Sequence, residues 1–497
     1  MSKLWTRKPL SSLLGDSSTD GAHALKKTLG PLNLVALGVG AIIGAGLFVR
    51  TAAAAANNAG PSVTLAFVVA GIGCAFAGLC YAEFASMIPV AGSAYTYAYA
   101  TLGELVAWII GWDLILEYGI GAATVGIAWS EYLNKLLEFI PGAPTIPFAW
   151  CHSPFEVMRD ATGAVVSRGI MNVPALFIIL MLSLLLIRGM KESAFVNGII
   201  VITKVAIVIL IIIFGWGFID PANHHPLIPS PQIVVDSQGV SHHYGGILGI
   251  LGAAGVVFFA FIGFDAVSTA AQESINPKRD MPIGILGSLV VCTVLYILFA
   301  HVLTGIASVQ DFRSSGREAS VAFAITRHMP GYGWLAKLVT VAILAGFSSV
   351  ILVMLMGQSR VFFSMSQDGL VPKVFSDVHP KFRTPYKSNL LFFVFVGLFA
   401  AFVPGDIVGD MTSIGTLFAF VLVCVGVWVL RVRDPNAPRQ FVTPMVPLVP
   451  ILGIIVNAAM IFGLGWPNWL RLGVWLVLGL TIYFGYSRKH SKLTAAK

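Results

Sequence analysis

The chain has 497 residues, of which 57% are hydrophobic and 11% are charged, whereas soluble domains carry about 25% charged residues. This composition excludes a soluble globular protein and predicts a single bundle of membrane-spanning helices. The formal net charge of +8 lies in loops between apolar segments, so we do not expect the clustered basic face that binds nucleic acid.

The cysteines and histidines predict no metal site, and we expect no cofactor of any kind. The five cysteines stand far apart and show no metal-binding spacing. His224, His225, His242 and His243 share one loop without a further ligand at a familiar spacing. The polar, basic stretch Met1–Pro31 has no apolar core, so a cleaved secretory signal is not expected either.

Twelve apolar segments follow, and a helix needs about 20 residues to cross a bilayer. An even number puts both termini on one side of the membrane. About two thirds of the 31 lysines and arginines fall on that side, which predicts that it is the cytoplasm and that the protein lies in the plasma membrane. The segments lie near residues 32–56, 61–88, 104–134, 172–189, 193–217, 246–273, 283–308, 335–365, 389–404, 411–430, 446–465 and 469–486.

The first segment is rich in glycine, with Gly38, Gly40, Gly44 and Gly46. Glycine weakens a helix by about 1 kcal/mol relative to alanine, and hydrocarbon tolerates unpaired backbone groups only around a protein cavity. A break here would direct N–H groups from the outer half and C=O groups from the inner half at one point, which suits a small zwitterion. The alternative is an unbroken helix whose small residues let a neighbour pack closely.

The sixth segment carries Gly263 and Asp265 at its centre, where an unbroken apolar helix would have neither. Interrupted segments at positions one and six predict two inverted five-helix repeats, with substrate and coupling ion held between the breaks. Asp265 is expected either to cap the restarted half-helix or to take part directly in binding a proton or the substrate.

Lys204 lies eleven residues from the start of the fifth segment, roughly 16 Å along a helix. This is too far for its side chain to reach the membrane surface. Lys204 must therefore face the interior of the bundle, where it either finds acceptors or loses its proton. Two roles stay open, a switching charge and a permanent cation that ties helices together.

The third segment carries Asp113 and Glu117, whose spacing puts both carboxylates on one helix face. Such a pair can share a proton. Glu117 lies deeper in the segment and is the better candidate for coupling; the alternative is that one acid is bonded to hydroxyl groups and the other lies near an aqueous vestibule.

Other charges lie near the cytoplasmic ends of the segments. Glu83 and Glu104 are expected to pair there with cations of the loops. Asp368, with Arg360 and Lys373, is expected to form an intracellular latch with a structural or gating role.

Four stretches resemble the amino acid permeases of the amino acid–polyamine–organocation superfamily, with closest similarity to bacterial relatives of the cationic amino acid transporters. They are Gly40–Phe48, Tyr81–Ala85 with Pro89–Tyr95, Phe258–Asp265 and Gly357–Leu370. The resemblance implies an all-α membrane protein of twelve helices with the leucine-transporter-type 5+5 inverted repeat, helices 1 and 6 broken, plus two further helices. The implied parts are a cytoplasmic segment 1–31, the repeats 32–217 and 246–430, two helices in 446–486 and a cytoplasmic tail 487–497.

The resemblance and the polarity of helix ends together imply that backbone groups bind the substrate. Carbonyls near Ile42, Phe259, Ala260 and Ile262 would take the ammonium group, and the N–H groups of Gly44, Ala45 and Gly46, beside Ile43, would take the carboxylate. The family often has Ser or Thr at the position of Ala45. The alanine of this chain lacks their hydroxyl group but keeps the backbone donors. Phe259 matches the family's aromatic gate; the alternative is ordinary helix packing.

Two side chains gain roles from the same resemblance. Lys204 matches a position beside the first break, where its ammonium replaces the sodium ion of sodium-driven relatives. Met354 matches the pocket for the substrate's side chain. Because methionine is apolar and no acid stands beside it, small neutral amino acids such as alanine are expected to be better substrates than arginine.

The chain has no His-Glu-x-x-His, Gly-x-Ser-x-Gly or Walker sequence, so neither an enzyme nor an ATP-driven pump is expected. We expect secondary active transport of L-amino acids by alternating access, with proton symport as the coupling. A cationic amino acid or polyamine exchanger is the alternative, and a channel-like or sensor protein is the alternative of another class. The expected partners are amino acids, protons and the lipid bilayer, with at most a small single-helix membrane protein besides.

Overall fold

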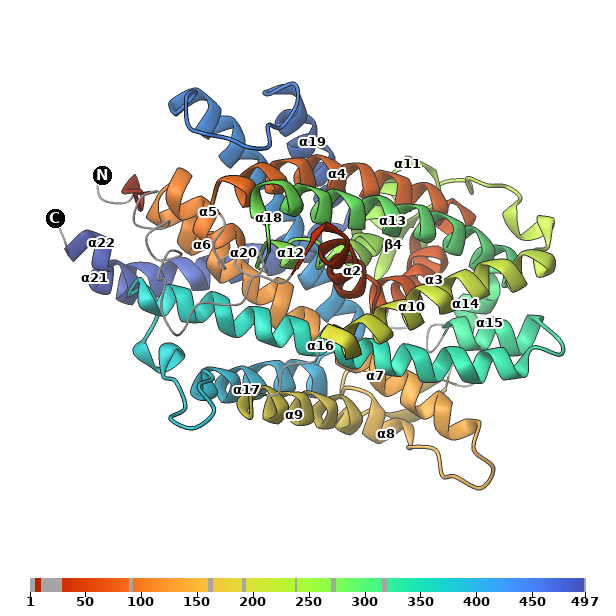
Figure 1. The fold of residues 1–497 in the computed structure, drawn as a ribbon. Helices are drawn as coiled ribbons and strands as arrows, with labels where there is room; N and C mark the ends of the chain where they lie inside the picture. The colour runs from red at the N-terminus through yellow and green to blue at the C-terminus, as the bar shows by residue number, and fades with distance from the viewer. Residues whose placement is uncertain are drawn as a thin grey trace.

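The computed structural model describes residues 5–9, 29–88, 93–159, 164–189, 194–236, 239–269, 274–314 and 320–495. Helices dominate, and the long ones run along a common direction (Figure 1). Several predicted features lie outside the described residues: most of the segment 1–31, motif residues 89–92, the end of the sixth apolar segment at 270–273, and the last two residues of the tail.

Each apolar segment predicted from the sequence contains helix. Among the described residues, eight helices are long and apolar enough to cross a membrane, and four shorter apolar helices have 10–17 residues. The helices within the segments are α2 (Pro31–Ile42), α4 (Val63–Met87), α6 (Glu104–Leu114), α7 (Gly121–Glu138), α9 (Val173–Ile187), α10 (Ala194–Gly215), α11 (Gly246–Val257), α13 (Pro277–Ile306), α16 (Gly333–Gln367), α17 (Tyr386–Phe402), α18 (Gly405–Arg433), α19 (Leu448–Gly463) and α20 (Trp466–Ile482).

The first and sixth segments are interrupted, as their glycines predict. After α2, the chain leaves helical geometry and restarts as the π-helical turn η2 (Gly46–Arg50), followed by α3 (Thr51–Ala54) and η3 (Ala55–Ala59). After α11, a 3₁₀ turn η8 (Phe258–Phe261) leads through a non-helical stretch to the short helix α12 (Ala266–Thr269). A further π-helical turn, η5 (Ile115–Ile120), lies between α6 and α7 and was not expected.

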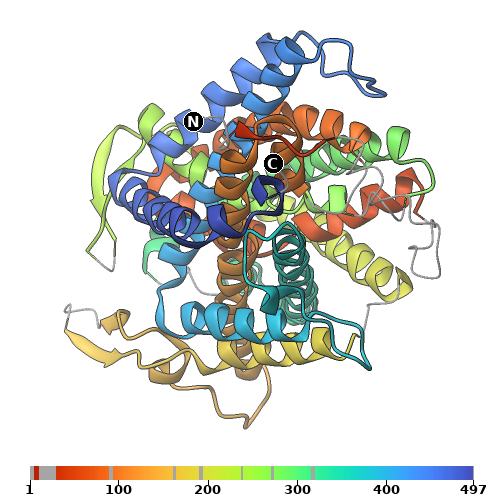
Figure 2. The same ribbon diagram turned by 90° about the vertical axis from the view of Figure 1, so that its left-hand side faces the viewer.

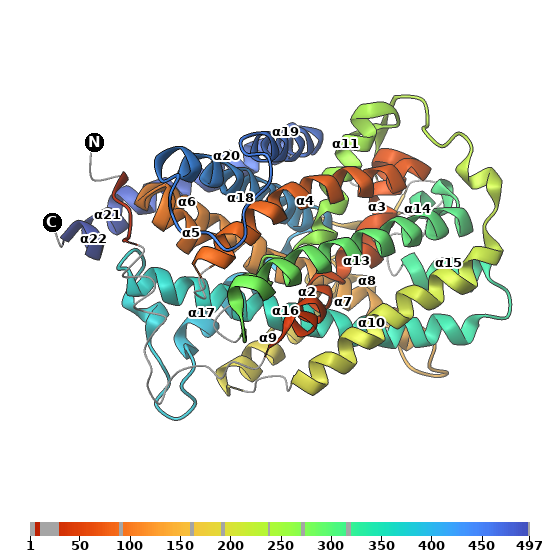
Figure 3. The ribbon, with the colours of Figure 1, turned by 45° about the horizontal axis from the view of Figure 1, so that its top comes forward.

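The connections contain elements that apolar patterning does not reveal. In the described residues, two of the connections contain an antiparallel β-hairpin. In the second hairpin, Ile233 pairs with His243. Helices α14 and α15 lie at the end of the bundle opposite to Trp5–Pro9 and the C-terminal turns (Figures 1 and 3). The additional elements are η4 (Gly60–Ser62), α5 (Ser93–Thr101), α8 (Phe148–Cys151), β1 (Val157–Arg159), β2 (Val165–Arg168), η6 (Trp216–Phe218), η7 (Pro221–His224), β3 (Gln232–Val235), β4 (Ser241–Tyr244), α14 (Val309–Ser314), α15 (Ser320–His328), η10 (Lys373–Ser376), η11 (Tyr483–Ser487), α21 (Arg488–His490) and α22 (Lys492–Ala495).

Helix α2 is packed against α13, α10, α16 and α12, whereas α9 and α17 lie beside each other at the margin of the bundle (Figures 1 and 2). Gly40 makes the α2–α10 contact close, because a methyl group at this position would lie 2.3 Å from Cγ2 of Val201. The side chain of Lys204, one helical turn further along α10, therefore reaches α2.

Candidate functional site

The two interrupted segments touch each other at their glycines. A methyl group at Gly46 would lie 2.2 Å from Cα of Ala260, and one at Gly263 would lie 2.9 Å from the carbonyl oxygen of Ala41. Gly263 also has a φ of +114°, which side chains rarely adopt. Because both close contacts are with backbone atoms, neither glycine has room for a side chain.

The break in the first segment brings unlike backbone ends together. The last carbonyls of α2 and the first N–H groups of η2 lack partners within their own helices, so acceptors from one side and donors from the other meet at Ile43–Gly46. Ile42, Ile43 and Ala45 are buried at this point. The arrangement offers hydrogen bonds to an anionic group and a cationic group of one small molecule.

Two of the carbonyls predicted to bind an ammonium group already accept bonds from the protein. The hydroxyl of Tyr296 donates to the carbonyl of Ala260 at 2.9 Å, and the N–H of Ile262 donates to the carbonyl of Phe259 at 3.3 Å. A carbonyl oxygen has two lone pairs, so these bonds hold η8 in position and leave one acceptor site on each oxygen. The ring of Phe259 is buried in η8.

Val350 of α16 lies beside the break. Its Cγ2 atom lies 3.3 Å from the position that a Cβ atom on Gly44 would occupy. Met354, which is predicted to line the pocket for the substrate's side chain, lies one turn further on, with Sδ 3.3 Å from the equivalent position on Gly121 of α7. A small apolar pocket beside the break is lined by Ile43, Phe48, Lys204, Ile207, Ala342, Ile343, Gly346 and Phe347.

Lys204 faces the interior of the bundle, as its distance from the end of the helix predicts. Its Nζ atom donates to the carbonyl of Gly40 at 2.8 Å, in the last part of α2, and the residue is only 3% exposed. The stem of the lysine passes Gly346 of α16, where a methyl group would lie 2.8 Å from Cε. Lys204 thus connects α10, α16 and the inner side of the first break.

Glu117 and Asp265 lie together in the core. The hydroxyl of Tyr118 donates to Oδ2 of Asp265 at 2.5 Å. The Glu117 carboxyl interacts with the Asp265 carboxyl and lies near the hydroxyl of Thr416, although neither of its oxygens forms a hydrogen bond of good geometry. Two buried carboxyl groups in contact repel each other when both are charged, which favours one proton shared between them.

The surroundings of this carboxyl pair differ from the expected ones in one respect. Asp113, one turn before Glu117, is buried too, and Asp265 of another segment is a further carboxyl group near Glu117. Besides the predicted pair of Asp113 and Glu117 on one helix face, there is thus a pair of Glu117 and Asp265 between two segments. Asp265 also directly precedes α12, the position from which a carboxylate can cap a helix.

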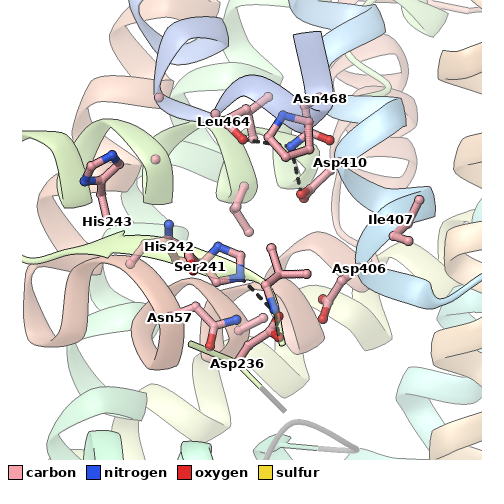
Figure 4. Close-up of a pocket in the computed structure, with 18 of the residues that line it drawn as sticks. Asn57, Asp236, Ser241, His242, His243, Asp406, Ile407, Asp410, Leu464 and Asn468 are labelled. Carbon is pink, nitrogen blue, oxygen red and sulfur yellow. Dashed lines mark hydrogen bonds and ion pairs between the residues drawn. The ribbon is translucent and has the colours of Figure 1, made fainter. Parts of the chain in front are cut away.

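An ion cluster of Arg50, Asp406 and Asp410 ties η2 to α18 at the end of the bundle opposite to Trp5–Pro9. Arg50 is buried and donates to Oδ1 of Asp406 at 3.1 Å and to Oδ1 of Asp410. A cavity of about 110 Å³ adjoins this outer ion cluster (Figure 4). Asp236 and His242 of the β3–β4 hairpin, 3.1 Å apart, line the same cavity.

A second ion cluster, of Lys8, Tyr95 and Asp368, lies at the end that carries the described parts of both termini. Lys8 Nζ lies 3.1 Å from Oδ1 of Asp368, and the hydroxyl of Tyr95 donates to Oδ2 at 2.7 Å. The N–H of Lys492 donates to the backbone carbonyl of Asp368 at 3.1 Å. This inner ion cluster thus joins α16 to α5 and to both termini.

The two glutamates at the same end have different partners. Glu83 forms ion pairs with Arg431 at 2.9 Å and Arg439 at 3.1 Å, as predicted. Glu104 differs from the prediction, because its partners in the described part of the chain are hydroxyl groups and not loop cations. Its donors are Tyr99, Tyr483 and Ser491.

A bundle of apolar helices in which two interrupted helices meet around buried ionisable groups is the architecture of a membrane carrier. The chain belongs to the amino acid permease family of the amino acid–polyamine–organocation superfamily, whose description is "Amino acid permease" and whose match covers residues 29–477. This is a family of multi-pass membrane transport proteins and not of enzymes.

Three relatives illustrate the range of the similarity. The chain is 43% identical to a branched-chain amino acid permease of Bacillus subtilis (strain 168), over 99% of each chain. It is 38% identical to a methylthioribose transporter of the same organism, over 99% of this chain and 100% of the relative. It is 28% identical to the vacuolar cationic amino acid transporter 4 of Arabidopsis thaliana, over 96% and 94% of the two chains.

Proposed function

We propose that this protein carries neutral L-amino acids across the plasma membrane by alternating access, driven by symport of protons. The contact between the two interrupted segments at Gly46 and Gly263 is the observation that carries the proposal. The architecture that goes with it is a 5+5 inverted repeat of residues 32–217 and 246–430, two further helices in 446–486, and cytoplasmic ends at 1–31 and 487–497. Accumulation of labelled isoleucine in proteoliposomes under an inward proton gradient tests it.

Backbone groups at the two breaks would bind the groups that all amino acids share. The N–H groups of Gly44, Ala45 and Gly46 suit the carboxylate, because the first N–H groups of a helix attract anions. The ammonium group would take the opposing carbonyls near Ile42, Phe259, Ala260 and Ile262. Recognition through the backbone leaves selection among amino acids to the side chains around the breaks.

Those side chains favour an apolar substrate. Ile43 and Val350 adjoin the first break, Phe259 follows in η8, and Met354 lies one turn from Val350. An aliphatic side chain gains free energy from burial among these groups, at about 25 cal/mol per Å². The 43% identity to a branched-chain amino acid permease supports the same choice.

Arginine is therefore expected to compete at least about tenfold more weakly than isoleucine for uptake of labelled isoleucine, because a guanidinium group without a counter-charge is heavily penalised in an apolar pocket. Uptake with a series of unlabelled competitors measures this. Val350→Ala should admit bulkier competitors more than Met354→Ala does, since Val350 lies nearer to the break. Equal competition by arginine and isoleucine in the parent protein would contradict the proposed substrate class.

Two sets of groups would couple substrate transport to protons. One is Lys204, and the other is the pair of Glu117 and Asp265. Lys204 holds the carbonyl of Gly40, so the charge on its ammonium affects the inner half of the first interrupted segment directly. The Glu117–Asp265 pair lies between η5 and the interruption of the sixth segment, and the number of protons on the pair affects how closely these two elements can approach.

Glu117→Gln is expected to abolish the response to a proton gradient, because an amide cannot take up or release the proton that the carboxyl pair shares. Exchange of internal for external isoleucine at equal pH should persist within a factor of about three. The matched variant Glu131→Gln, on α7, should retain both activities. Full proton-driven accumulation by Glu117→Gln would exclude Glu117 from coupling.

The outer and inner ion clusters would close the two ends of the pathway. Arg50 belongs to the outer half of the first interrupted segment and is bound to α18, so outward opening requires separation of Arg50 from Asp406 and Asp410. Inward opening requires release of Asp368 from Lys8 and Tyr95. Both clusters are formed in this structure, as expected of an occluded carrier.

A further inference from the structure

Several buried polar side chains near the Glu117–Asp265 pair have no hydrogen-bond partner among the residues that the structure describes. They are the hydroxyls of Tyr81, Tyr97 and Ser268, the amide of Gln358 and the carboxyl of Asp113. Each of these residues is at most 1% exposed. Buried polar groups in folded proteins are almost always bonded to protein or to ordered water.

Three of these groups form a sequence that leads away from the carboxyl pair. The ring of Tyr81 on α4 packs against Phe264, the residue before Asp265, with centroids 5.6 Å apart. The rings of Tyr81 and Tyr97 lie 6.4 Å apart. Tyr97 on α5 lies close to Ser268 on α12, although their hydroxyls form no hydrogen bond of good geometry among the described residues.

Of these hydroxyl groups, that of Tyr97 belongs to α5, which lies at the end of the bundle that carries the inner ion cluster. Tyr95 and Tyr99, on either side of Tyr97 in the chain, bind Asp368 and Glu104 at that end. The hydroxyls of Tyr81, Tyr97 and Ser268 thus lie between the carboxyl pair and the proposed cytoplasmic face.

The walls around these hydroxyls are aromatic. Phe84 stacks on the ring of Tyr97 at 5.4 Å, and Phe264 and Phe420 lie at 5.6 and 5.5 Å from the ring of Tyr81. The titratable groups that interact with Tyr81 are Asp265, Glu117, Tyr97 and Cys424. A polar track of this kind, enclosed by apolar rings, suits a few ordered waters.

We propose that water molecules connect Tyr81, Ser268 and Tyr97 into a polar column that carries the proton from the Glu117–Asp265 pair to the cytoplasm. The column rests on the proposed proton symport. A hydroxyl accepts a proton through a lone pair while its own proton passes to the next water, so each group ends as it began and no net charge stays on it. The tyrosines position water and are not the coupling groups themselves.

Tyr97→Phe tests the column, because it removes the hydroxyl and keeps the ring that stacks on Phe84. We expect proton-driven uptake of isoleucine to fall at least tenfold, whereas exchange of isoleucine at equal pH stays within twofold of the parent protein. Tyr483→Phe is the matched control, since Tyr483 is equally buried and its hydroxyl donates to Glu104, outside the column. It should change neither activity.

Equal losses of uptake and exchange in Tyr97→Phe would overturn the proposal, because they indicate a purely structural role. Unchanged proton-driven uptake would overturn it as well. A parent protein that ignores the proton gradient would instead refute the symport on which the column rests.

The water itself is tested separately, with Ser268→Cys in a background whose native cysteines are serine. We expect a small, membrane-impermeant thiol reagent to label this cysteine from the cytoplasmic side only, although Ser268 has no exposed surface in the structure. Labelling from that side supports the column whatever the coupling ion is. A cysteine that stays unlabelled in folded protein would refute it.

Discussion

Replacing Gly46 by alanine is expected to lower amino acid uptake by at least about a hundredfold. The added methyl group would lie 2.2 Å from Cα and 2.4 Å from the backbone nitrogen of Ala260, and backbone atoms cannot turn aside as a flexible side chain can. The two interrupted segments must therefore separate, which disturbs both sets of backbone groups that would bind the substrate. A misplacement of about 1 Å at such a site can cost two orders of magnitude.

The matched control for this variant is Gly198→Ala, because a methyl group at Gly198 on α10 would have no atom within 4 Å. Initial rates of labelled isoleucine uptake, normalised to the amount of folded protein in the membrane, should match the parent protein for Gly198→Ala. Normal uptake by a folded Gly46→Ala variant would show that the contact between the breaks does not form the binding site.

Lys204→Ala is expected to reduce proton-driven uptake by at least about a hundredfold. The substitution removes the ammonium that binds the carbonyl of Gly40 and leaves that buried acceptor without its partner. It also empties the space beside Gly346 that the stem of the lysine fills. Lys337→Ala, at an exposed position of α16, is the control and should transport normally.

The pattern of loss distinguishes the two roles of Lys204. A switching charge predicts that Lys204→Ala still exchanges isoleucine at equal pH but ignores a proton gradient. A permanent cation predicts that both activities disappear and that the thermal stability of the protein falls. Accumulation equal to the parent under a proton gradient would contradict both.

The features that the sequence predicts best depend on single residues in an apolar environment. Gly46 and Gly263 stand out because glycine gives up helix stability, and the structure interrupts the helices at these positions. Lys204 stands out because a charge so far from the ends of a helix must face the interior of the protein. In both cases the environment restricts the residue so strongly that no knowledge of its neighbours is needed.

The features that the sequence does not predict depend on which two residues come into contact in the folded protein. Tyr118 and Asp265 lie 147 positions apart in the chain, and neither residue type requires the other. Val350 and Met354 are both apolar and differ by about one helical turn, so only the rotation of α16 decides which of them reaches the break.

Short polar elements escape prediction for another reason. Helix α5 reads Ser93–Thr101 with alternating small and aromatic residues, which gives no apolar span and no clear helical period. Glu104 binds Tyr483 and Ser491 from the far end of the chain, and hydroxyl donors of this kind carry no charge that would mark them as partners.

The two ion clusters also bear on how easily the protein changes state. Arg50 of the outer cluster is buried, whereas the Lys8–Asp368 pair of the inner cluster is partly exposed, and pairs of the latter kind contribute only about 0.2–1 kcal/mol. Two states that differ by energies of this size are both populated. A ligand therefore needs only a small difference in affinity, about 1.4 kcal/mol, to shift the ratio of the two states tenfold. Because the inner ion cluster stabilises its closed end by only a small energy, a nutrient that binds weakly, and not only a ligand that binds tightly, can determine which side of the membrane the carrier faces.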